Sequence, residues 1–192
     1  NYTKDAHSVV KIFDESGKFL CNLDNDMIGT IGGFSGEAED TETFYTVTSY
    51  ITPATIYQYD VKNNKSTLYK KSEIKFNSDE YVTEQKFFTS KDGTKVPMFI
   101  THKKGIKMDG NNPTLLYGYG GFNISLTPSF SATRVAWLEQ GGVLAIVNLR
   151  GGGEYGKEWH EAGTKMKKQN VCDDCIAAAE FLINQKYTSK EK

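Results

Sequence analysis

The pattern of hydrophobic and polar positions changes near residue 77. Before it, short runs alternate apolar and polar residues between polar turns, as in Thr55–Asp60. Beyond it, the apolar runs are continuous or spaced as on one side of a helix. Alternation is typical of half-buried strands, and the later patterns indicate buried strands and amphipathic helices. We therefore place a domain boundary at Asn77-Ser78, with a β domain over residues 1–77 and an α/β domain over residues 78–192.

The β domain contains a repeated strand–turn–strand unit. Each copy has an aromatic residue followed by aspartate, a polar turn and a returning strand, and Asp14 and Asp60 are 46 residues apart. A period of about 40–50 residues with several strands per unit is typical of β-propeller blades, which need neighbouring blades to bury their faces. The predicted fold is thus a propeller remnant, and a plain antiparallel meander fits the same pattern. The predicted strands are Val9–Asp14, Phe19–Leu23, Thr43–Tyr50, Thr55–Asp60 and Ser66–Tyr69.

The α/β domain opens with a hairpin. Glu84–Thr89 and Val96–Thr101 flank a turn that contains Asp92-Gly93, a strong hairpin signal. A short strand at Leu115-Leu116 and a continuous apolar run at Val143–Leu149 follow, and the second is typical of a buried parallel strand. An antiparallel hairpin followed by strands and helices in alternation predicts part of a doubly wound sheet.

Two helices are predicted in this domain. Thr127-Pro128 has the form of an N-cap followed by proline at the first helical position, and the helix would end near Leu138, before Gly141. The second helix follows from one apolar stripe, in which the cysteines are expected to be buried structural thiols. The stripe consists of Val171, Cys172, Cys175, Ile176, Ala179, Leu182 and Ile183.

Composition narrows the class of protein. A net charge of −1 in 192 residues gives no electrostatic footprint for nucleic acid or for an anionic membrane. Three cysteines favour a reducing compartment over a disulfide framework. The chain begins with Asn1 and no secretory signal follows, so we expect its native start to lie elsewhere. These features predict a reducing compartment, and the lone pair Cys172 and Cys175 offers too few ligands for a metal site.

Two glycine-rich strings, Tyr117–Phe122 and Arg150–Gly156, each follow an apolar run. Ligands of open α/β sheets bind at the carboxyl ends of the strands, so both strings are expected on one functional rim. Gly151, Gly153 and Gly156 formally match the dinucleotide fingerprint. Glu154 within that string would repel a pyrophosphate, and the acidic residues at the fingerprint distance fall in a helix. A nucleotide-binding module using Gly151–Gly156 is the alternative function.

Tyr119 is the strongest candidate for a catalytic residue. Glycines on both sides allow a tight turn and a close approach of substrate. A tyrosine hydroxyl donates a hydrogen bond at neutral pH, as an oxyanion hole requires. Phe122 would offer an apolar surface beside it. Alternatively, Tyr117, Tyr119 and Phe122 are core aromatics.

Taken together, the strings resemble the prolyl oligopeptidase family of serine peptidases. The matching strings are Ser90–Met98, Tyr117–Ser125, Asn148–Gly156, Trp159-His160, Lys168–Asn170 and Asp173-Asp174. The resemblance implies a seven-bladed propeller inserted in an α/β-hydrolase fold, with residues 1–77 as its last blades and residues 78–192 as the start of the returning catalytic domain. It implies a monomeric, cytosolic endopeptidase that cleaves short peptides after proline without a cofactor.

The same resemblance implies roles for single residues. Tyr119 would be the oxyanion-hole hydroxyl and Phe122 part of the substrate-pocket wall, whereas Arg150 and Glu154 receive no role. The family's nucleophilic serine follows the helix that ends near Tyr187, and its aspartate and histidine lie further downstream. None of the three is assigned within this chain, so we expect a fragment that is inactive alone.

Overall fold

The computed structural model describes residues 1–23 and 27–192 and divides into two compact units. The first unit comprises Asn1–Phe76 together with Thr127–Ser131, and the second comprises Asn77–Leu126 and Ala132–Lys192. The sequence pattern assigned Thr127–Ser131 to the α/β domain, whereas the structure groups this short segment with the first unit.

The predicted start of the first helix is wrong, because α1 runs only over Ala132–Glu139. The backbone of the segment before α1 forms hydrogen bonds with side-chain hydroxyls of the first unit. Thr30 Oγ1 donates to the Pro128 carbonyl at 2.7 Å, and the Phe130 N–H donates to Thr48 Oγ1 at 3.3 Å. These tertiary hydrogen bonds override the local signal of the Thr-Pro pair. The end of the helix agrees with the prediction, since Gly141 has a φ of +85°.

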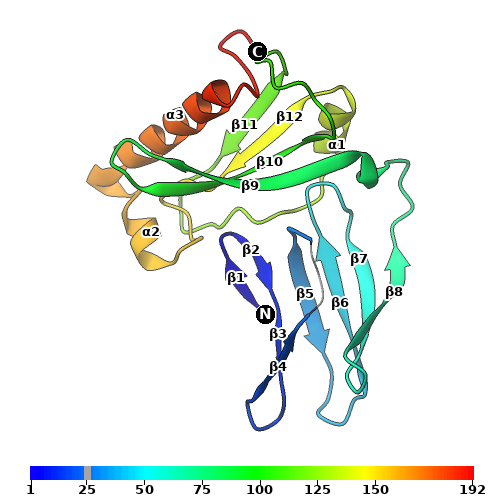
Figure 1. Ribbon diagram of the computed structural model, residues 1–192. Helices are drawn as coiled ribbons and strands as arrows, with labels where there is room; N and C mark the ends of the chain where they lie inside the picture. Colours follow the sequence, from blue (N-terminus) through cyan, green and yellow to red (C-terminus); the bar gives the residue numbers. More distant parts are fainter. Residues whose placement is uncertain (24–26) are drawn as a thin grey trace. The chain divides into compact units, whose positions relative to one another are not determined.

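In the part of the first unit that the structure describes, the strands form three antiparallel sheets (Figure 1). The largest is a four-stranded meander in the order β5-β6-β7-β8, which is the form of a propeller blade. The repeated hairpins β3–β4 and β7–β8 belong to different sheets, as a blade repeat requires. The strands are β1 (Tyr2–Lys4), β2 (His7–Val9), β3 (Lys11–Phe13), β4 (Phe19–Asn22), β5 (Thr30–Ser35), β6 (Glu42–Thr48), β7 (Thr55–Asp60) and β8 (Lys65–Lys71).

The repeated aspartates close the turns of these two hairpins. Asp14 Oδ1 accepts hydrogen bonds from the Ser16 hydroxyl at 2.6 Å and from the Lys18 N–H at 2.9 Å. Asp60 accepts from the side chain of Asn63 at 2.8 Å and from its N–H at 3.0 Å. Hydrogen bonds to the carboxylate lower the pKa of both aspartates, led by the side chains of Ser16 and Asn63. The repeat therefore reflects a shared turn chemistry.

The second unit contains a four-stranded mixed sheet in the order β11-β12-β10-β9. β9 and β10 form the long antiparallel hairpin, β10 pairs antiparallel with β12, and β11 pairs parallel with β12. This confirms the predicted α/β architecture with an antiparallel edge. The strands are β9 (Tyr81–Thr89), β10 (Lys95–Lys103), β11 (Thr114–Gly118) and β12 (Val143–Val147), and a 3-10 turn, η1 (Ser78–Glu80), precedes them.

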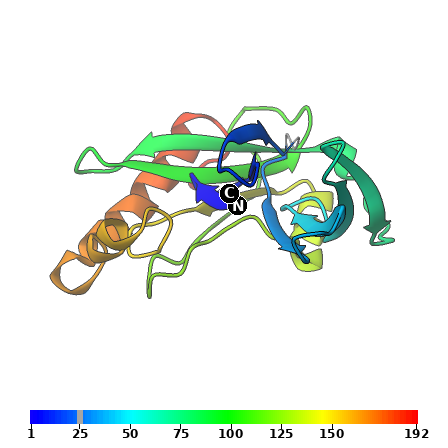
Figure 2. The same cartoon turned by 90° about the horizontal axis from the view of Figure 1, so that it is seen from below.

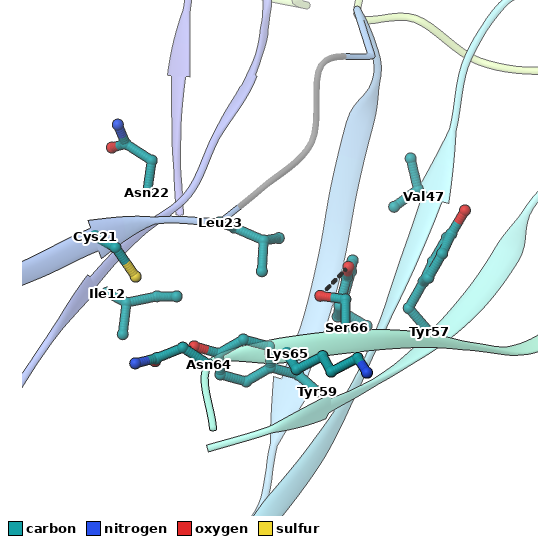
Figure 3. A pocket seen from close by; sticks show the side chains of 11 residues that line it. Ile12, Cys21, Asn22, Leu23, Val47, Tyr57, Tyr59, Asn64, Lys65 and Ser66 are labelled. Atoms are coloured by element: carbon teal, nitrogen blue, oxygen red, sulfur yellow. Dashed lines mark hydrogen bonds between the residues drawn. The ribbon is translucent and has the colours of Figure 1, made fainter. Parts of the chain in front are cut away.

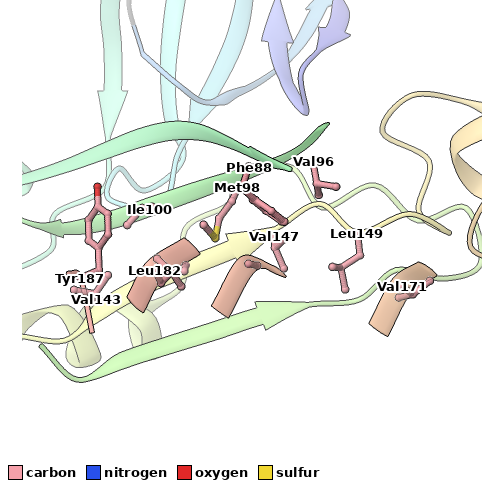
Figure 4. Packing of buried hydrophobic residues seen from close by; sticks show 12 residues of the cluster. Phe88, Val96, Met98, Ile100, Val143, Val147, Leu149, Val171, Leu182 and Tyr187 are labelled. Atoms are coloured by element: carbon pink, nitrogen blue, oxygen red, sulfur yellow. The ribbon is translucent and has the colours of Figure 1, made fainter. Parts of the chain in front are cut away.

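One face of the sheet packs against α3 (Gln169–Asn184), which runs beside the β9–β10 hairpin (Figure 2). Buried hydrophobic side chains from both form one cluster between them (Figure 4). α1 contacts β10 and β12. Two short elements precede α3, namely α2 (Lys157–Glu161) and η2 (Lys165–Lys167). The core side chains include Val96, Met98, Ile100, Val143, Ala145, Val147, Val171, Ala178 and Leu182.

The predicted stripe of α3 is partly wrong. Val171 and Leu182 are buried, but Cys172 is exposed and 56% of Ile176 is exposed. Asp174 is completely buried at a position that the apolar stripe left out. The buried face of α3 therefore includes a carboxylate, which hydrophobic spacing alone does not predict.

Candidate functional site

The two glycine-rich strings lie on neighbouring strand ends, as predicted. β11 and β12 pair in parallel with Tyr117 opposite Ile146 and Gly118 opposite Val147. The first string starts within the last paired residues, at Tyr117, and the second starts shortly after β12 ends at Val147. Both loops therefore leave the same edge of the sheet at its carboxyl end (Figure 1). In open α/β sheets this edge is where ligands bind.

The loops are in direct backbone contact. Gly120 has a φ of +58°, and a Cβ at this position would lie 2.6 Å from Val171 Cγ1 and 2.9 Å from the Arg150 carbonyl. Gly151 has a φ of +91°, and its Cβ would lie 2.6 Å from the Gly120 carbonyl oxygen. Only glycine fits at either position, because Val171 and the Arg150 carbonyl fill the side-chain space of Gly120 and the Gly120 carbonyl fills that of Gly151.

Tyr119 and Phe122 are exposed on the first loop. The exposed fraction is 43% for Tyr119 and 84% for Phe122, so neither is a core aromatic. Phe122 has a φ of +50°, an uncommon backbone conformation for a residue with a Cβ. Among the residues that the structure describes, the Tyr119 hydroxyl makes no hydrogen bond, which leaves it available to an incoming group.

The far end of this loop is held by two buried polar side chains. Glu154 Oε1 accepts from the Leu126 N–H at 3.0 Å, and Asn148 Nδ2 donates to the Leu126 carbonyl at 2.8 Å. Asn148 also donates to Glu154 Oε1 at 3.1 Å. Glu154, for which the sequence indicated no role, thus links the second glycine loop to the end of the first.

The loop is also held near Tyr119. Lys168 Nζ donates to the Gly120 carbonyl at 2.7 Å. Sequence reasoning used Lys168 only as part of a matching string, and its contact depends on how α3 lies against the sheet.

Arg150 lies at the centre of a buried ion-pair network. Its Nε and Nη2 donate to the two carboxylate oxygens of Asp174 at 3.0 and 2.7 Å, a bidentate arrangement. The Ser90 hydroxyl donates to the same carboxylate at 2.6 Å. Arg150 Nη1 donates to Asp92 and, at 3.2 Å, to Thr94 Oγ1. The guanidinium therefore joins α3, the β9–β10 turn and the second glycine loop.

This network shifts the ionisation of its members. The hydrogen bond from Arg150 lowers the pKa of Asp92 to about 2, although burial acts in the opposite direction. Hydrogen bonds to Asp174 and Asp92 raise the pKa of Arg150. Both groups are thus charged throughout the neutral range. The Arg150 side chain is 5% exposed, so its guanidinium is enclosed by the residues of this network.

The arrangement of the second loop argues against a nucleotide site. A Cβ at Gly152 would collide with the Glu154 carboxylate, and a Cβ at Gly153 would lie 2.5 Å from the Asn123 carbonyl oxygen. In a dinucleotide site the second glycine of the fingerprint, here Gly153, leaves room for the pyrophosphate. Here the chain's own atoms occupy that room, so the match to the fingerprint does not carry a binding function.

A cavity of about 420 Å³ lies in the first unit, between the β3–β4 hairpin and the β5–β8 sheet (Figure 3). Four of its polar side chains form two hydrogen-bonded pairs. The Tyr59 hydroxyl donates to Asn64 Oδ1 at 2.6 Å, and the Tyr45 hydroxyl donates to Ser66 Oγ at 2.8 Å. Nothing in this lining resembles a catalytic set.

Residues 1–23 and 27–192 also lack the features of two other classes of site. No group of three or more histidine, cysteine, aspartate or glutamate side chains in this part is arranged to hold a metal ion. No helix in it is long and apolar enough to cross a membrane.

Comparison with known families identifies both parts of the chain. The model of the prolyl oligopeptidase N-terminal β-propeller domain matches residues 1–72, and that of the prolyl oligopeptidase family matches residues 128–192. The chain is 53% identical over 190 residues to a prolyl endopeptidase of Elizabethkingia miricola, and 42% identical over 196 residues to one of Dictyostelium discoideum. These alignments cover 99% and 100% of this chain.

Solved structures agree with the sequence comparison. The chain superposes on a structure from a study of two prolyl endopeptidases with a TM-score of 0.88 at 48% identity. It superposes on prolyl oligopeptidase B of Galerina marginata with a TM-score of 0.90 at 34% identity. Both alignments cover 98% of this chain and 28% and 27% of those structures, and the chain spans 27% of the Elizabethkingia miricola protein. The chain belongs to the prolyl oligopeptidase family and corresponds to only part of the length of these relatives.

Proposed function

We propose that the complete protein is a serine-type endopeptidase that cleaves short peptides on the carboxyl side of proline. The observation that carries the proposal is the exposed pair Tyr119 and Phe122 on one loop at the carboxyl end of β11. Their separation by two glycines allows both side chains to reach one substrate.

The two side chains suit different parts of the reaction. When a nucleophile attacks the scissile carbonyl, negative charge develops on its oxygen, and the Tyr119 O–H is available to donate a hydrogen bond to that oxyanion. Phe122 offers an aromatic face, which suits the apolar ring of a proline side chain. Tyr119 therefore acts on the transition state, whereas Phe122 contributes to substrate binding.

Relatives with solved complexes support a peptide substrate. Prolyl oligopeptidase B of Galerina marginata is described bound to a 35-residue hydrolysis and macrocyclization substrate. That enzyme matches 98% of this chain with a TM-score of 0.88.

The test is turnover by the complete enzyme. We expect cleavage of a reporter peptide with proline before the scissile bond, much slower cleavage when alanine replaces the proline, and inhibition by a serine-directed reagent. The 192-residue chain alone is expected to give no turnover, because no nucleophile, acid or base is assigned within it. Equal rates for proline and alanine reporters would refute the specificity, and inhibitor-sensitive turnover by the isolated chain would refute the fragment assignment.

Location and assembly are part of the same proposal. We expect a cytoplasmic, monomeric enzyme, supported by the unpaired state of Cys21, Cys172 and Cys175. Cell fractionation and light scattering of the complete enzyme test the two statements, and recovery in the medium or as a stable dimer would contradict them.

A further inference from the structure

The half-buried His160 of α2 lies where the two glycine loops meet. Its Nδ1 is 2.7 Å from the Gly151 carbonyl oxygen and 3.1 Å from the Asn123 nitrogen. The Asn123 N–H also donates to the Gly151 carbonyl, at 3.2 Å. One ring nitrogen therefore contacts both loops at the residue directly after Phe122.

Either tautomer of the ring joins the loops. With a proton on Nδ1, His160 donates to the Gly151 carbonyl, which also accepts the Asn123 N–H. Without that proton, Nδ1 accepts the Asn123 N–H directly. In both cases a side chain from α2 completes the hydrogen bonding around Asn123.

The backbone at this point needs such support. Phe122 and Asn123 have φ values of +50° and +57°, so two successive residues with a Cβ adopt the left-handed conformation. This conformation is unfavourable for phenylalanine and less so for asparagine, and it persists where the surroundings impose it, often in ligand-binding segments. Lys168 holds the other side of the turn at Gly120. Phe122 thus projects from a turn that is fixed on both sides.

We propose that His160 is a positioning residue, which fixes the Phe122–Asn123 turn and thereby the direction in which the Phe122 ring faces the substrate. The inference rests on the proposed role of Phe122 in binding the proline side chain. His160 does not touch the substrate in this proposal. It acts through the hydrogen bonds of Nδ1.

Two substitutions in the complete enzyme separate this role from ring packing. His160→Phe keeps an aromatic ring and removes the nitrogen, whereas His160→Asn removes the ring and keeps an amide that donates or accepts near the position of Nδ1. We expect His160→Phe to raise KM for a proline reporter roughly ten- to hundredfold, since small displacements of a binding group cost about that much. kcat should change less, because Tyr119 is held by other contacts. His160→Asn should restore most of the KM.

The opposite order, with His160→Phe near wild type and His160→Asn impaired, would show that the ring only packs and would overturn the proposal. A fall in kcat at unchanged KM in His160→Phe would also overturn it, because that result indicates fewer folded molecules. Glu158→Gln, on an exposed position of the same helix, is the matched control and should resemble wild type.

A double-mutant cycle tests whether His160 acts through Phe122. In a Phe122→Ala enzyme, adding His160→Phe should raise KM by less than threefold, because the ring to be positioned is gone. A full additional increase would contradict the proposal.

Amide hydrogen exchange gives a readout independent of activity. The peptide covering residues 119–126 should exchange faster in His160→Phe than in wild type or His160→Asn, whereas the peptide of β12 should not change. If the wild-type enzyme fails to cleave proline reporters, the proposed function fails but this measurement still tests the role of His160. Equal exchange in all three proteins would overturn the inference.

Discussion

At the scale of single residues, Tyr119 combines exposure with a fixed backbone. Its neighbour Gly120 is packed against the second glycine loop and held by Lys168, so the main chain beneath Tyr119 has little freedom. The phenol itself is 43% exposed. A rigid backbone with an accessible donor is what electrostatic stabilisation of a transition state requires, because no reorganisation is needed during the reaction.

Replacement of Tyr119 by phenylalanine in the complete enzyme should lower kcat by roughly 10²–10³-fold with a small change in KM, because the hydroxyl acts only when charge develops. Steady-state kinetics with a proline reporter measure both constants. Tyr117→Phe is the matched control, since Tyr117 is 44% exposed and lies two residues earlier. Equal kinetics in the two variants would assign Tyr119 no part in catalysis.

At the scale of elements, the Arg150 network joins α3 to the sheet. The carboxylate of Asp174 is fully buried and the Arg150 side chain is 5% exposed, so the pair is shielded from water. Breaking one partner of such a pair leaves an uncompensated buried charge, whereas replacing both by apolar residues is often tolerated. The position of α3, and with it Lys168 and Val171 against Gly120, depends on this pair.

Asp174→Asn should reduce the free energy of unfolding by about 3 kcal/mol, the lower end of the range for breaking a buried pair, because Asp92 still faces Arg150. The double variant Arg150→Met, Asp174→Leu should lose less than the single variant. Urea unfolding followed by circular dichroism gives both values. A loss below about 1 kcal/mol, as for surface pairs, would show that the network contributes little.

The sequence predicted the elements more closely than their ends and contacts. The hairpin at Asp92-Gly93, the parallel pair of strands and the repeated turns at Asp14 and Asp60 were predicted because each has a local chemical signal. The start of α1 and the burial of Asp174 were not, because they depend on hydroxyl and guanidinium groups distant in the sequence. His160 entered the sequence analysis only as part of the string Trp159-His160, and its contact with Asn123 appears only in the folded chain.

At the scale of the whole molecule, two ionisable groups give the second unit a pH-dependent stability at opposite extremes. Arg150 lowers the pKa of Asp92 from 3.8 to about 2. Burial, with help from Glu84, raises the pKa of Tyr187 from 10.0 to about 12. The Asp92 contribution is present above pH 3.8 and is lost as the pH falls toward 2. The Tyr187 contribution is present below pH 10.0 and is lost as the pH rises toward 12.

The measurement is the melting temperature of the complete enzyme against pH, compared with single variants. The difference between wild type and Asp92→Asn should shrink between pH 4 and pH 2, because the carboxylate of the wild type becomes protonated there. The melting temperature of the wild type should fall relative to that of Tyr187→Phe between pH 10 and pH 12, because the Tyr187 contribution is lost there. Differences that stay constant across these intervals would contradict the assignment of the two groups.

The backbone contact between Gly120 and Gly151 has an evolutionary consequence. A clash between two side chains can be relieved by a second, compensating substitution, but a Cβ at Gly151 would meet the carbonyl oxygen of Gly120, which every amino acid carries. No exchange at one position can therefore rescue a change at the other. We expect both to be invariant glycines in an alignment of homologues, without any covariation between them, so that methods based on correlated substitutions would miss the contact that joins the two loops.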